Sequence, residues 1–343
     1  MADRLVWRGG ERVAILGIES LVYGVDDVGV CTKFFDDFGL PLISQGQSVR
    51  TFKLEEGSKV ILRQIDDPAL PRSALVGTGV REVIWGVDSP ESLEALTADL
   101  RRDREVRHDG DGTVHFLTDC GLPFALRLFT KTRVVSAPDL LNAAGTVNRL
   151  NRPRKWRLRA RPKVINHVVF NVADFEKSFA FVRDRLNFRA TDFQRTFGIY
   201  ARCDGARQHH NLFFLNAGLP FPGFDGQPRF NHANFGVEDI DEIMVGANHM
   251  ERCGWPKSIL GLGRHRIDSA LFCYLPCPTG GDAEYGADAD YVDDSWMPRD
   301  WINPLFGYLT FAHNMPPFFM EVPSWDVQFH ADFAPPRKSQ VHE

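Results

Sequence analysis

The feature that most constrains this chain is an internal repeat. A strand-like segment followed by an amphipathic helical segment occurs at 165–188, and a segment of the same shape occurs at 20–40. A second pair follows, in which 231–250 parallels 81–100 at an offset of 150 residues. Repeated supersecondary units bury their apolar faces against their neighbours. The 343 residues are therefore predicted to form four short strand–helix–strands units arranged as two tandem pairs.

Helix start signals inside the repeats support this division. Asp174 is predicted as the N-cap of the helix in the first unit of the second half. In the second pair of units, Asp239 followed by Glu242 is a capping-box pattern. Ser89 followed by Pro90 places an N-cap before a proline in the first helical turn.

The repeat also predicts the domains. We expect an N-terminal scaffold domain without a metal site at 13–135, a basic linker at 136–162, a catalytic domain at 163–330 and a flexible tail at 331–343. Eight basic and no acidic residues lie between 148 and 163, which would suit a nucleic-acid patch or a solvated linker. We interpret the stretch as a linker, because it is short and the net charge of −5 gives no overall attraction to nucleic acid.

Composition narrows the class of protein further. Hydrophobic residues make up 43% and charged residues 25% of the chain, as in globular proteins, which excludes a chain disordered throughout. The apolar stretch at 301–320 is interrupted by Asn, His and Pro, so no membrane span is expected. The start lacks a signal-peptide core and the six cysteines form no CxxC pair, which predicts reduced thiols in the cytoplasm. Cys273 and Cys277 have a possible metal-binding spacing, but we interpret them as strand cysteines.

Candidate chemistry lies in the second half, which holds nine of the eleven histidines after position 166. Apolar and more polar positions alternate around His167, which places it on the open face of a strand. His232 has the same position on a later strand, and a third strand carries Asp282, Glu284 and Gly286 on one face. Two histidines and one carboxylate suit an iron(II) facial triad, with zinc as the chemical alternative.

The repeat allows the three candidate ligands to be compared with the matching positions in the first half. The first-half positions that match the three candidate ligands are Ser20, Glu82 and Ala125, at offsets of 147, 150 and 159 residues. Ser, Glu and Ala together do not form a metal site. The first half is therefore predicted to repeat the scaffold without the ligands.

These motifs together resemble the type I extradiol ring-cleavage dioxygenases of the vicinal-oxygen-chelate superfamily, over residues 13–295. The motifs that carry the resemblance are, in order, INHVVFNV with His167, HHNLFFL with His210, FNHANFGV with His232, GLGRH with His265, then Tyr274, and PTGGDAEYG with Glu284. The resemblance implies an α+β fold. Four βαβββ modules would pair into two tandem vicinal-oxygen-chelate domains, each an incomplete mixed β-barrel with flanking helices.

The resemblance also implies an activity. An extradiol dioxygenase cleaves the ring of a substituted catechol with O2 to a hydroxymuconic-semialdehyde-type product, in aromatic catabolism. The implied cofactor is iron(II), or less commonly manganese(II), held by His167, His232 and Glu284. The partners expected are a catecholic small molecule and O2, with no nucleic acid and no membrane, and the chain is expected to form a homo-oligomer.

Three further residues are implied to be catalytic. His210 would act as the base and stabilise bound oxygen, His265 would hydrogen-bond a substrate oxygen or position its neighbour, and Tyr274 would hold the diol. Each also has a structural interpretation, with His265 in a surface loop and Tyr274 in the core. An apparent insertion at 218–227 departs from the family pattern and leaves open whether His209 or His210 points inward; the motif favours His210.

Two other functions fit the same scaffold. One is another metal-dependent vicinal-oxygen-chelate enzyme, an isomerase or a thiol transferase. The other is a non-catalytic protein that binds a small molecule. The unliganded first half argues against the first alternative, and the number of histidines in the second half argues against the second.

Overall fold

The computed structural model describes residues 14–46, 48–221, 223–319 and 327–330. Each repeat unit folds as one strand, one helix and three strands. The first two units are β1 (Ile15–Val25), α1 (Val28–Phe38), β2 (Leu42–Gln45), β3 (Val49–Lys53), β4 (Lys59–Gln64), and β5 (Gly79–Val87), α2 (Pro90–Leu100), β6 (Arg107–His108), β7 (Val114–Leu117), β8 (Pro123–Leu128). The last two are β9 (Val164–Val172), α3 (Phe175–Leu186), β10 (Arg189–Gln194), β11 (Gly198–Arg202), β12 (Leu212–Asn216), and β13 (Arg229–Gly236), α4 (Ile240–Arg252), β14 (Gly263–Arg264), β15 (Leu271–Pro276), β16 (Asp282–Ala287). After these come β17 (Arg299–Trp301), α5 (Pro304–Tyr308), β18 (Phe311–Ala312), a 3-10 turn (Pro317–Phe319) and β19 (Val327–Phe329).

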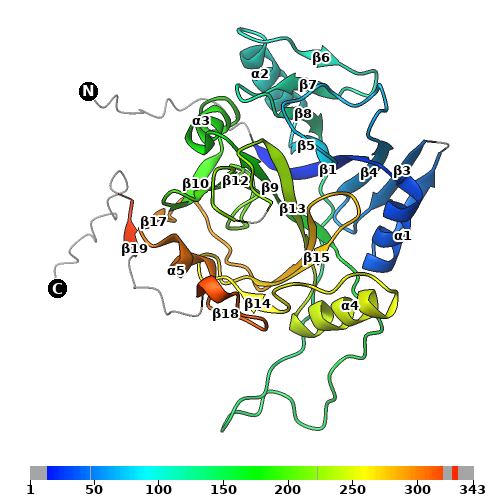
Figure 1. Cartoon of the computed structure of the whole chain (residues 1–343), viewed down its shortest axis with the longest axis vertical. Coiled ribbons are helices and arrows are strands. Elements are labelled where there is room, and N and C mark those ends of the chain that lie inside the picture. Colours follow the sequence, from blue (N-terminus) through cyan, green and yellow to red (C-terminus); the bar gives the residue numbers. More distant parts are fainter. Residues whose placement is uncertain (1–13, 47, 222, 320–326, 331–343) are drawn as a thin grey trace.

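Each pair of units forms one mixed sheet (Figure 1). The strand order is β2-β3-β4-β1-β5-β8-β7-β6 in the first sheet and β18-β14-β15-β16-β13-β9-β12-β11-β10-β17-β19 in the second. In every unit the first strand pairs in parallel with the last, and the first strands of paired units run antiparallel at the centre. Both sheets are open in this order, which confirms the predicted α+β fold with incomplete barrels.

Each sheet is built from strands of one half of the chain. The first sheet lies within 13–135 and the second within 163–330, while the predicted tail at 331–343 lies outside the described residues. The exact domain limits stay a prediction.

The helix start signals behave as the sequence predicted. Asp174, Asp239 and Ser89 are N-caps, and the side chain of each accepts the backbone N–H three residues on, at 2.8, 3.0 and 3.2 Å. Glu242 differs in detail from a capping box, because its carboxylate accepts the N–H of Glu238 and not that of the N-cap. These caps determine the residue at which each of α2, α3 and α4 begins.

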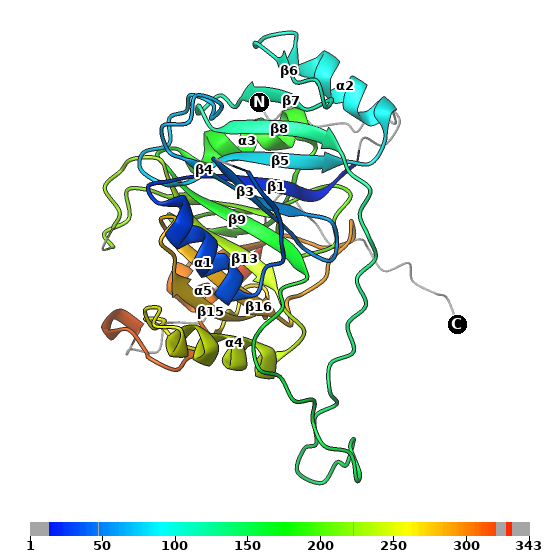
Figure 2. The ribbon, with the colours of Figure 1, turned by 90° about the vertical axis from the view of Figure 1, so that its right-hand side faces the viewer.

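The two halves share one hydrophobic core. In Figure 2, α1 of the first half lies over β13 and beside α4 of the second. The Phe38 ring on α1 stacks on Tyr285 of β16 with centroids 4.0 Å apart, and the Tyr285 hydroxyl donates to the Phe38 carbonyl at 2.7 Å. Trp85 of the first sheet packs edge-on against Phe188 after α3. The first half therefore supports the second directly.

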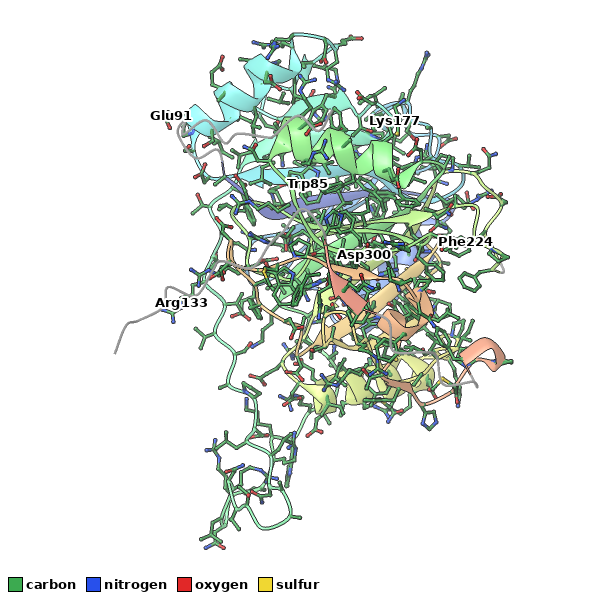
Figure 3. The ribbon with its side chains drawn as sticks, turned by 90° about the vertical axis from the view of Figure 1, so that its left-hand side faces the viewer. Trp85, Glu91, Arg133, Lys177, Phe224 and Asp300 are labelled. Carbon is green, nitrogen blue, oxygen red and sulfur yellow. The ribbon has the colours of Figure 1, made fainter. Side chains whose placement is uncertain are left out.

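The basic linker is tied to the start of α4. Lys155 pairs with Glu238 at 2.9 Å, and Arg157 contacts both Glu238 and the N-cap Asp239, at 3.1 Å for the latter. Part of the linker extends away from the body of the protein (Figures 2 and 3). The linker bears exposed apolar side chains, including Trp156 at 94% exposure. Several basic side chains of the linker are therefore paired with acidic side chains of the same chain.

Two smaller features also bear on the sequence analysis. Cys273 and Cys277 are both buried, and burial raises the pKa of the Cys273 thiol to about 11, which disfavours the thiolate that binds metal. None of the helices in the described part of the chain has the length and apolarity needed to cross a bilayer.

Candidate functional site

The strand register brings the three candidate metal ligands onto one face of the second sheet. Asn234 on β13 pairs with His167 on β9 and with Glu284 on β16. His232 lies two residues before Asn234 and therefore on the same face of β13. Three neighbouring central strands thus deliver two imidazoles and one carboxylate to one point.

The first sheet has the same register without the ligands. Ile84 on β5 pairs with Ser20 on β1 and with Ala125 on β8, and Glu82 lies two residues before it. These are the positions that the repeat offsets assigned, so the predicted correspondence is confirmed. Glu82 instead bonds His115 at 2.8 Å, and an apolar cluster that includes Ile84 and Ala125 fills the face. Among the described residues, no group of three potential ligands lies wholly in the first half.

The geometry of the triad suits a divalent ion. The Nε2 atoms of His167 and His232 are 3.3 Å apart, and Oε2 of Glu284 is 3.3 Å from the first and 3.4 Å from the second. Bonds of about 2.1 Å put donor atoms roughly 3.0 Å apart at right angles and roughly 3.4 Å apart in a tetrahedron. The three donor atoms therefore fit around one metal ion.

The protonation states also suit metal binding. Nδ1 of His232 donates to the Asn231 side-chain oxygen at 2.7 Å, which leaves Nε2 with a free lone pair. Burial lowers the pKa of His232 to about 3, so the ring is neutral near pH 7. Burial raises the pKa of Glu284, but the adjacent His167 and His232 rings outweigh it and lower that pKa to about 2. Oε2 of Glu284 is buried with no hydrogen-bond donor among the described residues, as expected of an atom kept for a cation.

The predicted site residues meet at one cavity of about 300 Å³. Five of the six line it, namely His167, His210, His232, His265 and Tyr274, while Glu284 is 1% exposed in the sheet below. Aromatic and aliphatic side chains form most of the remaining wall. An apolar cavity with a few convergent polar groups is typical of a small-molecule site.

His210 is the member of the His-His pair that lines the cavity. Its ring stacks on His167 with centroids 4.1 Å apart. Burial holds the pKa of His210 well below its usual range, so the ring is neutral near pH 7. His209 lies behind it, 1% exposed, and contacts His210 and Asp192.

His265 and Tyr274 form a second hydrogen-bonded pair at the cavity. Nδ1 of His265 donates to the Tyr308 carbonyl at 2.7 Å, so Nε2 accepts the hydroxyl proton of Tyr274 at 2.9 Å. His265 stacks on Phe272 and is largely buried, so the surface-loop interpretation is wrong. The Tyr274 oxygen keeps lone pairs for a ligand in the cavity.

Sequence reasoning missed several lining groups. Asp268 lines the cavity with its Oδ2 3.8 Å from Nδ1 of His210, and only its closeness to His265 in the chain could have signalled it. The apparent insertion at 218–227 supplies Leu219, Phe221 and Phe224 to the wall. Apolar residues in a Gly-Pro loop give no signal of a binding role.

One further cluster of potential ligands lies between α1 and α4. Asp37, His249 and Cys253 approach one another there. The Asp37 carboxylate already accepts from Lys33 at 2.5 Å and from the Trp255 indole at 2.8 Å. These contacts account for the cluster as packing between two helices.

Comparison with known proteins gives the relatives of this chain. Residues 164–246 match the model of the Glyoxalase/Bleomycin resistance protein/Dioxygenase superfamily. The chain is 24% identical over 301 residues to metapyrocatechase 2 of Cupriavidus necator, covering 84% of this chain and 87% of that protein. It is 32% identical over 149 residues to an iron-dependent extradiol dioxygenase of Rhodococcus jostii (strain RHA1), covering 40% of this chain and 47% of that protein.

Solved structures share the fold at low identity. A halotolerant catechol dioxygenase, BphC, has a TM-score of 0.65 at 17% identity, covering 84% of this chain and 92% of that one. A Mn(II)-bound glyoxalase from Novosphingobium aromaticivorans has a TM-score of 0.64 at 22% identity, covering 84% and 88%. Residues 164–246 therefore match a domain of the glyoxalase/bleomycin resistance protein/dioxygenase superfamily, and the homologues of the chain include proteins named as extradiol dioxygenases.

Proposed function

We propose that this protein is an extradiol dioxygenase that opens the ring of a substituted catechol with O2 to a hydroxymuconic-semialdehyde-type product. The observation that carries the proposal is the buried triad of His167, His232 and Glu284 at the floor of a cavity that also holds three acid–base side chains. In this proposal the triad binds iron(II), with manganese(II) as the alternative metal. A bound metal of this kind supplies chelation of the adjacent catechol oxygens and activation of dioxygen.

The side chains around the cavity have distinct roles in this proposal. His210, whose pKa is lowered by burial so that the ring is neutral near pH 7, takes a proton from the diol. Tyr274 holds a substrate oxygen, and His265 fixes the direction of the Tyr274 hydroxyl through their 2.9 Å hydrogen bond. Apolar side chains such as Phe197 and Phe224 exclude water and contact the ring substituent.

The proposal extends to the rest of the chain. Residues 13–135 act as a scaffold, because their equivalent sheet positions carry Ser20, Glu82 and Ala125 in place of ligands. The six cysteines are all free, which supports a reducing compartment such as the cytoplasm. Exposed apolar side chains on the linker, including Trp156, support the homo-oligomer expected from the sequence.

A direct test measures oxygen uptake. The protein is reconstituted anaerobically with Fe(II) or Mn(II) and mixed with a panel of catechols in an oxygen electrode. We expect one O2 consumed per catechol, with a yellow ring-opened product whose NMR spectrum shows cleavage beside the diol. A muconic diacid from catechol, or no uptake with either metal, would contradict the proposal. Isomerisation of a thiol adduct of a 2-oxoaldehyde without O2 would favour the glyoxalase-type alternative, which the fold of the Mn(II)-bound neighbour also accommodates.

A further inference from the structure

A chain of buried hydrogen bonds leads from the cavity wall into the protein. Nδ1 of His210 lies 3.2 Å from Nδ1 of His209, and Nε2 of His209 lies 2.7 Å from Oδ2 of Asp192 on β10. Asp192 is fully buried, His209 is 1% exposed and His210 is 6% exposed. Two ring nitrogens at this distance form a hydrogen bond only if one of them carries the proton.

The partners of Asp192 decide where that proton lies. Arg299 binds both carboxylate oxygens, with Nε 2.9 Å from Oδ1 and a terminal nitrogen 2.6 Å from Oδ2. A carboxylate held by arginine accepts hydrogen bonds, so His209 donates to it through Nε2. With the Asp192 charge already paired by Arg299, the hydrogen-bond arrangement that adds no further charge has Nδ1 of His209 as an acceptor. His210 must then donate through Nδ1, which leaves its Nε2 unprotonated.

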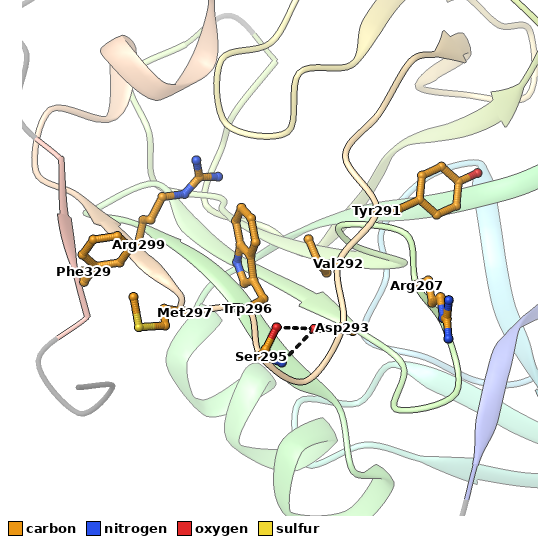
Figure 4. Close-up of a pocket in the computed structure, with 9 residues that line it drawn as sticks. All are labelled: Arg207, Tyr291, Val292, Asp293, Ser295, Trp296, Met297, Arg299 and Phe329. Carbon is orange, nitrogen blue, oxygen red and sulfur yellow. Dashed lines mark hydrogen bonds between the residues drawn. The ribbon is translucent and has the colours of Figure 1, made fainter. Parts of the chain in front are cut away.

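Trp296 and Arg299 cover the side of these hydrogen bonds that faces away from the cavity. The Trp296 indole donates to the Thr191 carbonyl at 2.8 Å, and its ring lies edge-on to His209 at 5.9 Å. The Arg299 guanidinium lies over Trp296, 4.7 Å from the ring centroid. Figure 4 shows these two side chains in the wall of a separate surface hollow. Asp192 is fully buried and His209 is 1% exposed, so bulk water has little access to the hydrogen bond between them.

We propose that Asp192 and His209 fix the proton of His210 on Nδ1 and so present a basic Nε2 to the cavity. His209 is then a positioning residue that acts through His210. The inference rests on the proposed function, because it assigns the state in which His210 takes the diol proton. The competing interpretation is that the His209–Asp192 pair only anchors the segment before β12 to β10.

Two variants separate these interpretations. Asparagine places its Oδ1 where histidine has Nδ1, so His209→Asn keeps the acceptor for His210 and loses the bond to Asp192. Glutamine places its Nε2 where histidine has Nε2, so His209→Gln keeps the bond to Asp192 and offers His210 no acceptor. We expect His209→Asn to keep kcat within about threefold and His209→Gln to lose roughly 10- to 100-fold in kcat with a smaller change in KM. Equal effects, or a larger loss in His209→Asn, would show an anchoring role only.

A readout on the metal-free protein tests the proton position without activity. With 15N-labelled histidine, NMR shifts distinguish protonated from unprotonated ring nitrogens. We expect His210 to carry its proton on Nδ1 in the wild type and in His209→Asn, and to show a mixture in His209→Gln. A proton on Nε2 of His210 in the wild type overturns the inference. If the iron-loaded wild type consumes no O2 with any catechol, the proposed function is wrong. The NMR experiment still tests the position of the His210 proton independently of activity.

Discussion

His232 contributes one third of the donor set, and the strands on both sides hold it in place. Its Nε2 is within 3.4 Å of the other two donor atoms, and Asn231 fixes its ring orientation. Replacing it with alanine leaves two ligands and an uncompensated buried Glu284. We expect His232→Ala to retain less than about one tenth of the iron that the wild type binds after anaerobic reconstitution.

The repeat offers a matched control for this variant. Glu82 has the same register position in the first sheet but bonds His115. We expect Glu82→Gln to keep one iron per chain, with an unchanged circular dichroism spectrum. Full iron retention in His232→Ala, or loss of iron from folded Glu82→Gln, would contradict the assignment of the site.

His210 tests chemistry separately from metal binding. It lines the cavity outside the triad, so His210→Asn should leave the iron content near that of the wild type. Asparagine cannot take a proton near neutral pH, and positioned acid–base groups contribute roughly 100- to 10,000-fold in rate. We expect turnover to fall at least about tenfold, since water or Tyr274 substitutes in part. Single-turnover ring opening at the wild-type rate would leave His210 without a catalytic role.

The candidate metal ligands were predictable because the repeat allowed each to be compared with the matching residue of the first half. His167 and His232 contrast with Ser20 and Glu82 at equal register, so the sequence separates a liganded half from an unliganded one. Asp192 had no such signal. It is one polar residue in a short strand, and only tertiary packing against Arg299 and His209 reveals its role.

The loop at 218–227, described except for residue 222, contributes Leu219, Phe221 and Phe224 to the cavity wall. It connects β12 to β13, and its half-buried Phe224 lines the cavity. Figure 3 shows Phe224 near the edge of the molecule. Removing part of an apolar contact of this size costs about 1 kcal/mol. We expect Phe224→Ala to raise KM about three- to tenfold for an aryl-substituted catechol and to change KM for unsubstituted catechol by less than twofold.

A surface phenylalanine serves as the control for that variant. Phe329 on β19 is 58% exposed and does not line the cavity, so Phe329→Ala should leave both KM values unchanged. If Phe224→Ala affects the two catechols equally, the loop does not select the substituent. Steady-state oxygen uptake with each substrate measures both outcomes.

Elements were predictable where a local signal specifies them. Asp174, Ser89 and Asp239 mark helix starts because a cap acts within three residues of the chain. The role of the inserted loop was not predictable. Its apolar side chains line the cavity because the sheet fixes the positions of β12 and β13. The spacing of residues within the loop does not indicate this position.

At the scale of the molecule, the two halves are joined by polar as well as apolar contacts. Glu56 of the first half accepts the N–H of Ile165 at 2.8 Å at the start of β9, two residues before His167. The stacked pair of Phe38 and Tyr285 joins α1 to the strand that carries Glu284. The repeat predicted two similar halves, but not this shared core, because an apolar stripe does not specify its partner.

A buried carboxyl group at this junction makes folding stability depend on pH. Oδ1 of Asp204, after β11, accepts the N–H of Ile15 at 2.7 Å at the start of β1. Burial raises the pKa of Asp204 from 3.8 to about 6. Between these values the folded state holds a proton that the unfolded state has lost, so stability falls as pH rises from about 4 to about 6. The deficit above that window is of the order of 3 kcal/mol at most.

Asp204→Asn removes the ionisation and keeps an oxygen that accepts the Ile15 N–H. We therefore expect the variant to unfold at higher urea than the wild type at pH 8, by about 1–3 kcal/mol in free energy of unfolding. Near pH 4 the two proteins should be equally stable, because Asp204 is protonated in the folded wild type there. Urea titrations of the metal-free protein at both pH values measure the difference. A stabilisation of equal size at pH 4 and pH 8 would show that ionisation of the buried Asp204 carboxyl group does not cause the difference in stability.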